Sequence, residues 1–201
     1  QAFFAGGILV EEMGGPSVKP PQPSGLWEAV AYVGSDTGVF QADEGPQKVH
    51  RRSLYTFWKR TAPPPQMATL DAPSRESCRV RRERTNTPLQ ALLLLNEPQY
   101  VEASRALAER TLRDPGATTD ERLARMFRIA AGRAPEAAEL AELAAALKDF
   151  TAHYADKPDQ AKALIETGAT RPDPALDPRE LAPWTMIGNV ILNLDEVVTK
   201  G

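Results

Sequence analysis

Proline is the residue that most limits how this chain can fold. Its 18 prolines include a dense run at residues 14–23 (GGPSVKPPQP) and three in a row at 63–65. Proline lacks a backbone N–H donor and fixes φ, so such runs are excluded from helix interiors and inner strands and suit polyproline II. Residues 1–47 are therefore predicted to form an extended, irregular arm.

Helix signals dominate after residue 85. Capping boxes begin at Thr87, Thr118 and Asp177, and apolar residues recur at helical spacing behind them. The run 91–95 is apolar all round, which favours a short buried helix. We predict an all-α fold in which a helical bundle spans about residues 85–200, with the arm and an arginine-rich insert packed on it.

Charge is spread unevenly along the chain. Residues 48–84 hold ten Lys and Arg against three acidic residues, a net charge of +7, while the whole chain carries −3. The remainder therefore carries −10. We describe the chain as a single domain of 1–201, made of the arm (1–47), a basic insert (48–84) and the bundle (85–201).

Several classes of protein are excluded by simple counts. One cysteine, Cys78, and two histidines allow no internal disulfide, zinc site or CxxCH haem attachment. No apolar run reaches the ~20 residues of a membrane helix. The chain opens at Gln1 without a visible signal peptide, so we expect a processed protein or a piece of a longer one.

The basic insert is the main candidate for function, because arginine forks bind carboxylate, sulfate or phosphate and stack on aromatic rings. The alternative is that its arginines pair with carboxylates of the same chain. The acidic total argues against nucleic acid. Candidate ligand-binding residues are Arg51, Arg52, Tyr55, Trp58, Lys59, Arg60, Asp71, Arg75, Arg81, Arg82, Arg84 and Asn86. No metal ligand set is predicted.

The stretch SLYTFWKRTAPPP (53–65) has an ambiguous period. Leu54, Phe57 and Trp58 would share one face of a short helix that ends before Pro63, with Trp58 as a core anchor.

Several stretches together resemble one known domain: GGPSVKPPQPSGLWEAVAY, the long string from RRSLYTFWKRTAPPP to LLLLNEPQYVEASRALAER, AGRAP, and LDPRELAPWTMIGNVILNLDEVVTK. They are similar to the C-terminal domain of large multidomain proteins of planctomycetes and related bacteria, whose function is uncharacterised. In that family the domain follows a planctomycete cytochrome-c-like module. The resemblance implies an exported, extracytoplasmic parent protein, with haem c in another domain and none in this chain.

Two hypotheses follow. In the first, the insert is one wall of a site for an anionic or sulfated glycan in a redox enzyme, completed by other domains of the parent. In the second, the chain is a non-catalytic scaffold or interaction domain whose arginines make intrachain and interdomain ion pairs. The direction in which the arginines point would separate the two.

Overall fold

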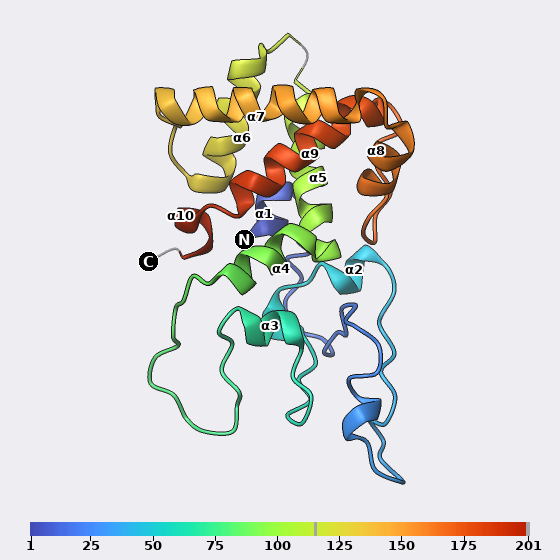
Figure 1. Cartoon of the computed structure of the whole chain (residues 1–201). Coiled ribbons are helices and arrows are strands. Elements are labelled where there is room, and N and C mark those ends of the chain that lie inside the picture. The colour runs from blue at the N-terminus through green and yellow to red at the C-terminus, as the bar shows by residue number, and fades with distance from the viewer. Residues whose placement is uncertain (115, 200–201) are drawn as a thin grey trace. The chain divides into compact units, whose positions relative to one another are not determined.

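Helices supply the regular structure of the protein, which confirms the all-α prediction. The computed structural model describes residues 1–114 and 116–199, and within these it contains ten α-helices, two short 3-10 helices and two isolated β-bridges (Figure 1). The α-helices are α1 (Ala2–Gly6), α2 (Pro46–Val49), α3 (Pro65–Thr69), α4 (Pro88–Asn96), α5 (Pro98–Leu112), α6 (Thr119–Ala131), α7 (Ala137–Ala155), α8 (Pro158–Ile165), α9 (Pro178–Leu192) and α10 (Asp195–Val198).

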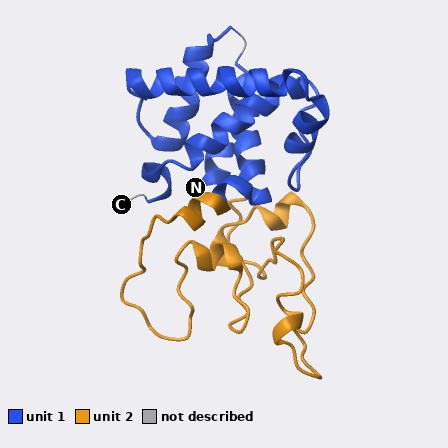
Figure 2. Cartoon of the chain, viewed as in Figure 1, with its two compact units in different colours: residues 1–8, 94–201 blue, residues 9–93 orange. Residues whose placement is uncertain are grey.

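The chain divides into two compact units (Figure 2). Unit 1 comprises residues 1–8 and 94–201, of which residues 1–8, 94–114 and 116–199 are described, and unit 2 comprises residues 9–93. In unit 1, α9 packs against α5, α7 and α8, and α1 packs against α5. Its core includes the fully buried Leu107, Leu123, Phe127, Leu181 and Ile187. The apolar stripes predicted for α6 and α9 therefore face this core.

The predicted helix starts are largely confirmed. Thr87 and Gln90 exchange the reciprocal bonds of a capping box, as do Thr118 and Glu121. Asp177 caps α9 by accepting a bond from the Arg179 N–H, so the box predicted there is a simple N-cap. The long helix α7 begins at Ala137, with Glu136 as its N-cap residue.

A close approach of backbones joins α5 and α9. A Cβ added to Gly188 would lie 2.8 Å from the carbonyl oxygen of Ser104, which is closer than van der Waals contact allows. Ser104 is itself fully buried, and its hydroxyl donates to the carbonyl of Tyr100 at 2.7 Å. Small residues at this crossing thus allow the two central helices of unit 1 to pack tightly.

Unit 2 contains little regular structure, as the proline runs predicted. The start of the predicted arm is different, because Ala2–Gly6 forms the helix α1 and packs against α5 in unit 1. Parallel bridges pair Val10 with Arg51 and Val18 with Thr56, so the arm lies along the start of the basic insert. The buried Trp27 contacts the ring of Phe40 at a centroid distance of 5.2 Å and that of Phe57 at 5.6 Å. Unit 2 therefore packs around a small aromatic cluster and not around a core of helices.

The short helix predicted at 91–95 forms as part of α4, but the prediction that it is buried is wrong. Leu94 of α4 is buried, but Leu92 and Leu95 are 57% and 41% exposed, as is Leu89 at 62%. A run of leucines has no polar face to set its orientation, so composition alone could not show that one side of this helix faces solvent.

The helical interpretation of SLYTFWKR is confirmed only in part. Ser53–Tyr55 forms a single 3-10 turn, and the chain is extended from Thr56. Leu54 is 75% exposed, so it is no anchor, while Phe57 and Trp58 are half-buried. Two backbone bonds pair this stretch with the arm: Val18 N–H donates to Tyr55 O, and Phe57 N–H donates to Val18 O. These bonds favour an extended conformation over a helix.

Arg133 joins three segments of unit 1 and gives the fold a pH dependence. Its guanidinium donates to Glu139 at 2.6 Å and to Glu196 at 2.7 Å, and it lies over the ring of Phe127. The bond from Arg133, followed by that from the Glu136 N–H, lowers the pKa of Glu139 to about 2 from 4.5. This stabilisation is complete above about pH 4.5 and is lost as the pH falls toward 2.

Replacing Glu139 with glutamine should therefore flatten the fall of the melting temperature between about pH 5 and pH 2, because a neutral amide has no proton to gain. Thermal unfolding followed by circular dichroism would measure this. Glu142→Gln, an exposed substitution on the same helix, is the control. Identical pH profiles for Glu139→Gln and the wild type would contradict the assignment.

Candidate functional site

Arg51 and Tyr55 hold the proline-rich arm. The Arg51 guanidinium, 7% exposed, donates to the carbonyls of Glu12 at 3.0 Å, Gly14 at 2.6 Å and Pro16 at 3.3 Å. It stacks on the Tyr55 ring at 3.9 Å, and the Tyr55 hydroxyl accepts a bond from the Gly14 N–H. Both predicted ligand residues are thus occupied within unit 2, where a charged fork satisfies backbone carbonyls that cannot pair in a sheet.

Lys59 also has an internal role. Its ammonium donates to the carbonyl of Thr37 at 2.7 Å and lies 4.8 Å from the centroid of the Trp27 ring. Lys19 lies 5.6 Å from the same centroid. Two cations near one buried indole are stabilised by the electrons of the ring, so Lys59 contributes to the aromatic cluster.

Asp71 organises the end of the insert. Its carboxylate accepts bonds from the N–H and hydroxyl of Thr85 and from the side-chain amide of Gln90. Burial opposes ionisation, but these bonds outweigh it, so the pKa of Asp71 lies below its ordinary value. The backbone of Asp71 is left-handed, with φ of 60°. This conformation disfavours most residues and is retained here by the bonds to the carboxylate.

Two more candidates form a stacked pair. The guanidinium of Arg75 lies 4.8 Å from the centroid of the half-buried Trp58 ring. Arg82 donates to the carbonyl of Leu70 at 2.9 Å. The candidate residues therefore come together in three groups: Arg51 with Tyr55, Trp58 with Arg75, and Asp71 with Thr85 and Gln90.

The remaining candidates face solvent. Arg52, Arg60, Arg81 and Arg84 are exposed, and none of their side chains makes a hydrogen bond or ion pair within residues 1–114 and 116–199. Asn86 is also exposed and precedes the cap of α4. The side chains of these arginines are therefore not paired with carboxylates of the described chain.

An arginine-rich loop, which we define as residues 73–87 and call the arginine loop, contains many of these side chains. All of its residues are exposed. It carries five arginines and two glutamates, a net charge of +3. Its arginines make one ion pair in the described part of the chain, between Arg79 and Glu83 at 3.1 Å, and exposed pairs of this kind contribute little stability. The loop therefore presents a surplus of positive charge to solvent.

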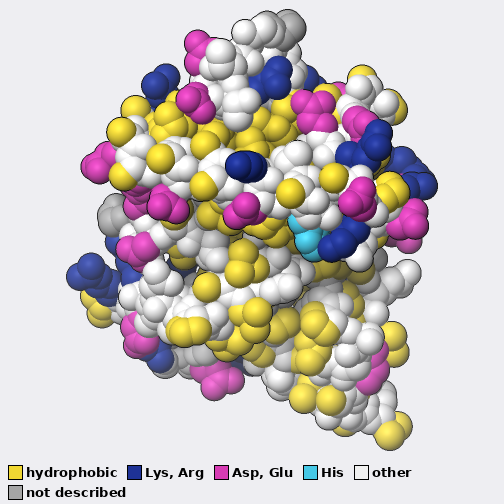
Figure 3. Space-filling model, turned by 45° about the horizontal axis from the view of Figure 1, so that its top comes forward, with side chains coloured by type: hydrophobic (Ala, Val, Ile, Leu, Met, Phe, Trp, Pro, Cys, Tyr) yellow, Lys and Arg dark blue, Asp and Glu magenta, His cyan; other side chains and the backbone are white. Residues whose placement is uncertain are grey.

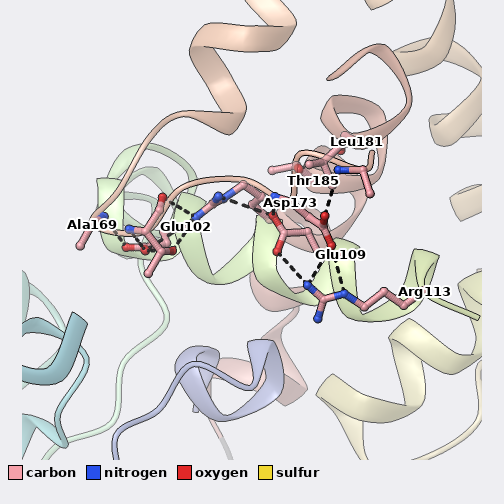
Figure 4. Close-up of polar contacts among 10 residues, drawn as sticks. Glu102, Glu109, Arg113, Ala169, Asp173, Leu181 and Thr185 are labelled. Atoms are coloured by element: carbon pink, nitrogen blue, oxygen red, sulfur yellow. Dashed lines mark hydrogen bonds and ion pairs between the residues drawn. The ribbon is translucent and has the colours of Figure 1, made fainter. Parts of the chain in front are cut away.

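A second polar cluster, which the sequence analysis missed, lies on α5. Glu102, Arg105, Glu109 and Arg113 follow one another at spacings of three, four and four residues, so they share one side of the helix (Figure 4). We call them the charge ladder. Glu102 and Arg105 are each 1% exposed and Glu109 is 9% exposed. Arg105 lies 3.7 Å from Glu102 and 3.5 Å from Glu109.

The charge ladder binds the segment before α9. Glu102 accepts bonds from the N–H groups of Ala169 and Thr170, and Arg105 donates to the Thr170 carbonyl. Further along, Glu109 accepts from the Asp173 N–H, and Arg113 pairs with the Asp173 carboxylate. Because these carboxylates and guanidiniums bind backbone groups and the Asp173 side chain of the segment, the ladder is suited to holding it rather than to binding an outside ligand.

A hollow in unit 1 does not provide an obvious charged site. It measures about 540 Å³, and its lining includes Arg122, Asp177, Arg179 and Glu180. Arg179 pairs with Asp177 at 3.2 Å, and Arg122 lies 4.0 Å from Glu180. Positive and negative groups are likewise interspersed on the face drawn in Figure 3. The hollow therefore offers a balanced set of charges.

No group of three or more His, Cys, Asp or Glu among the described residues is arranged to hold a metal ion. None of the described helices is both long and apolar enough to cross a bilayer. Cys78 lies exposed in the arginine loop.

Comparison with known proteins supports the resemblance seen in the sequence. The model of a protein family described as "PSD1: Protein of unknown function (DUF1553)" matches residues 1–147. No curated protein and no solved structure matches the chain. The matched range contains all of unit 2, including the arginine loop, and the charge ladder of unit 1. Because it covers well over half of the 201 residues, the chain belongs to the PSD1 family, a domain of unknown function typical of planctomycete-type proteins with cytochrome-c-like domains.

Proposed function

We propose that this chain is a non-catalytic interaction domain of a larger protein, and that its arginine loop binds an acidic surface on another domain of that protein. The observation that carries the proposal is the state of the loop: every residue is exposed, and of its five arginines only Arg79 pairs with a carboxylate in the described part of the chain. Such unpaired positive charge accelerates and directs association with an acidic partner.

The other charged residues of the insert support this division of roles. Arg51, Lys59 and Asp71 are occupied in holding unit 2 together. A protruding loop is a common site of recognition, whereas small-molecule ligands favour concave sites with convergent polar groups. Arg51, Lys59 and Asp71 have structural roles, whereas the arginines of the loop are exposed. Both observations favour a docking role for the arginine loop.

The family context supplies the setting of the proposal. The resemblance implies a parent protein that is exported and that carries a cytochrome-c-like module. We infer that this chain acts outside the cytoplasm, that haem c is bound by that module, and that the acidic partner surface belongs to a neighbouring domain of the same protein.

A second candidate function is supported by the stacked pair of Arg75 and Trp58. An indole partly open to solvent beside exposed guanidiniums suits an anionic or sulfated sugar ring. In this version the insert would form one wall of a glycan site in a redox enzyme. The two candidates differ in the chemistry of the ligand, and one binding experiment compares them directly.

The experiment measures binding of poly-glutamate and of a heparin oligosaccharide by isothermal titration calorimetry, at low salt and at about 150 mM salt. Replacing Arg81 and Arg84 together with alanine should weaken poly-glutamate binding about tenfold, if each exposed pair contributes about 0.7 kcal/mol. The matched control is Arg52→Ala with Arg60→Ala, which removes the same charge from exposed positions outside the loop.

Three outcomes are informative. A selective loss in the loop variant supports docking through the arginine loop. An equal loss in the control variant shows that only net charge matters and contradicts the proposal. Saturable heparin binding that survives about 150 mM salt, is much tighter than poly-glutamate binding and is lost in the loop variant would favour the glycan site instead.

A further inference from the structure

The helix α4 follows the arginine loop in the sequence, and one side of this helix is apolar and exposed. Leu89 is 62% exposed and Leu92 is 57% exposed, and residues three apart on a helix lie on the same side. We call them the leucine pair. Both belong to unit 2, as does the whole arginine loop. The leucine pair follows the arginine loop directly in the sequence. A partner that contacts both would gain from charge attraction and from burial of apolar surface.

Hydrogen bonds fix the end of the loop to the same helix. The side-chain amide of Gln90, which is 2% exposed, donates to the Thr69 carbonyl at 2.9 Å, to Asp71 at 3.1 Å and to the Thr85 hydroxyl at 2.9 Å. Thr85 N–H in turn donates to Asp71 at 2.8 Å. Because Gln90 lies between the two leucines in sequence and is anchored on the opposite side, the leucine pair is held outward beside the loop.

Arg84 is the loop cation best placed to act together with the leucine pair. It precedes the cap residue Thr87 by three residues, so at about 3.3 Å per residue it lies within roughly 10 Å of the start of α4. This distance is within the reach of a side chain from a docked helix. A partner that covers Leu89 can therefore place a carboxylate against Arg84.

We propose that the leucine pair and the arginine loop form one docking surface for an acidic amphipathic helix, an inference that rests on the proposed function. Such a helix would bury apolar side chains against Leu89 and Leu92 and would align its flanking carboxylates with Arg81 and Arg84. The occupant follows from charge complementarity, because the loop carries a net charge of +3. The apolar component favours a protein segment over a sulfated glycan, which offers no apolar face.

An anionic membrane surface is the other partner that combines negative charge with apolar contact. Two features disfavour it. Glu76 and Glu83 lie within the loop itself, and the chain outside residues 48–84 carries a net charge of −10, which an anionic bilayer repels. A discrete helix avoids most of that repulsion because it contacts only the basic surface.

The test compares two peptides of equal charge. The first is a synthetic peptide of about five helical turns with leucine at every third or fourth position and glutamate elsewhere, and the second is poly-glutamate. Replacing Leu89 and Leu92 together with glutamine should weaken binding of the amphipathic peptide about tenfold, measured by fluorescence anisotropy, and leave poly-glutamate binding unchanged. Leu54→Gln, at an exposed leucine of unit 2 outside this surface, is the matched control.

The outcomes separate this inference from the proposed function. If neither peptide binds the wild type, or if Arg81→Ala with Arg84→Ala has no effect on either, the proposed function fails and the inference fails with it. If poly-glutamate binding depends on those arginines but the leucine substitutions leave both affinities unchanged, only the inference is overturned. Tighter binding to phosphatidylserine vesicles than to the amphipathic peptide, lost in the leucine variant, would also overturn it. An unchanged melting temperature confirms that the leucine variant is folded.

Discussion

Replacing Glu102 with alanine is expected to lower the free energy of unfolding of unit 1 by about 3–5 kcal/mol, because the change removes one member of a buried charge network. The Glu102 carboxylate is 1% exposed, accepts bonds from two backbone N–H groups and lies 3.7 Å from Arg105. Its loss would leave the buried Arg105 with fewer negative neighbours and the amides of Ala169 and Thr170 without acceptors. Denaturant unfolding followed by circular dichroism measures the change.

The residues around Glu102 are packed too closely to rearrange and restore the lost contacts after this substitution. Gly168, at the start of the bound segment, has φ of +110°, and a Cβ added there would lie 2.5 Å from the Glu102 carboxylate. The segment and the carboxylate are therefore fitted to one another. Hydrogen exchange should show the amides of Ala169, Thr170 and Asp173 opening together in Glu102→Ala, since three of the ladder's contacts hold them.

Glu142→Ala is the control for this prediction, because Glu142 is exposed on α7 and its loss should change stability by no more than about 0.5 kcal/mol. Glu102→Gln should fall between the two, since an amide retains one acceptor but loses the charge that faces Arg105. A Glu102→Ala protein as stable as the Glu142→Ala protein would show that the charge ladder does not stabilise unit 1.

Local signals in the sequence predicted the helices of unit 1 well. The capping box at Thr118 begins α6 as predicted, because it acts through bonds within its own few residues. The buried stripe of α9 followed from its helical period, since Leu181, Ile187 and Ile191 are apolar and share one face. Features that depend on neighbouring residues can be predicted from those residues.

Features that depend on distant partners could not be predicted in this way. The charge ladder could not be predicted from α5 alone, because Glu102 and Arg105 are buried by a segment more than sixty residues away in the sequence. The alternation of Glu and Arg at positions 102, 105, 109 and 113 was a visible signal, but the same pattern also occurs on helix faces open to solvent. Only the position of residues 168–173 distinguishes the two cases.

The basic insert illustrates the same limit. Its arginines were predicted to bind either a ligand or carboxylates of the chain, but Arg51 binds three backbone carbonyls of the arm. Proline-rich chain makes few hydrogen bonds to itself, so its carbonyls need donors from elsewhere, and arginine can supply several in one plane. Composition shows that the chain contains a proline-rich arm and many arginines. It does not show that an arginine donates hydrogen bonds to the carbonyls of the arm.

Replacing Arg51 with alanine should therefore release the arm of unit 2 and lower the stability of that unit by about 2–4 kcal/mol, because three charge-assisted hydrogen bonds are lost together. The stacking on Tyr55 at 3.9 Å would be lost as well. Since Val10 and Val18 pair with residues on either side of Arg51, their amides report on the arm directly. Hydrogen exchange should show faster exchange at Val10, Gly14 and Val18 while the amides of unit 1 keep their protection.

Arg52→Ala is an unusually close control, because it removes the same side chain and the same charge one residue away, at an exposed position whose side chain has no partner in the described chain. Its exchange at Val10 and Val18 should match the wild type. Arg51→Lys should recover only part of the protection, since one ammonium cannot reproduce the planar fork that reaches the carbonyls of Glu12, Gly14 and Pro16. Equal exchange in Arg51→Ala and Arg52→Ala would mean that charge near the arm, and not the bonds of Arg51, holds it in place.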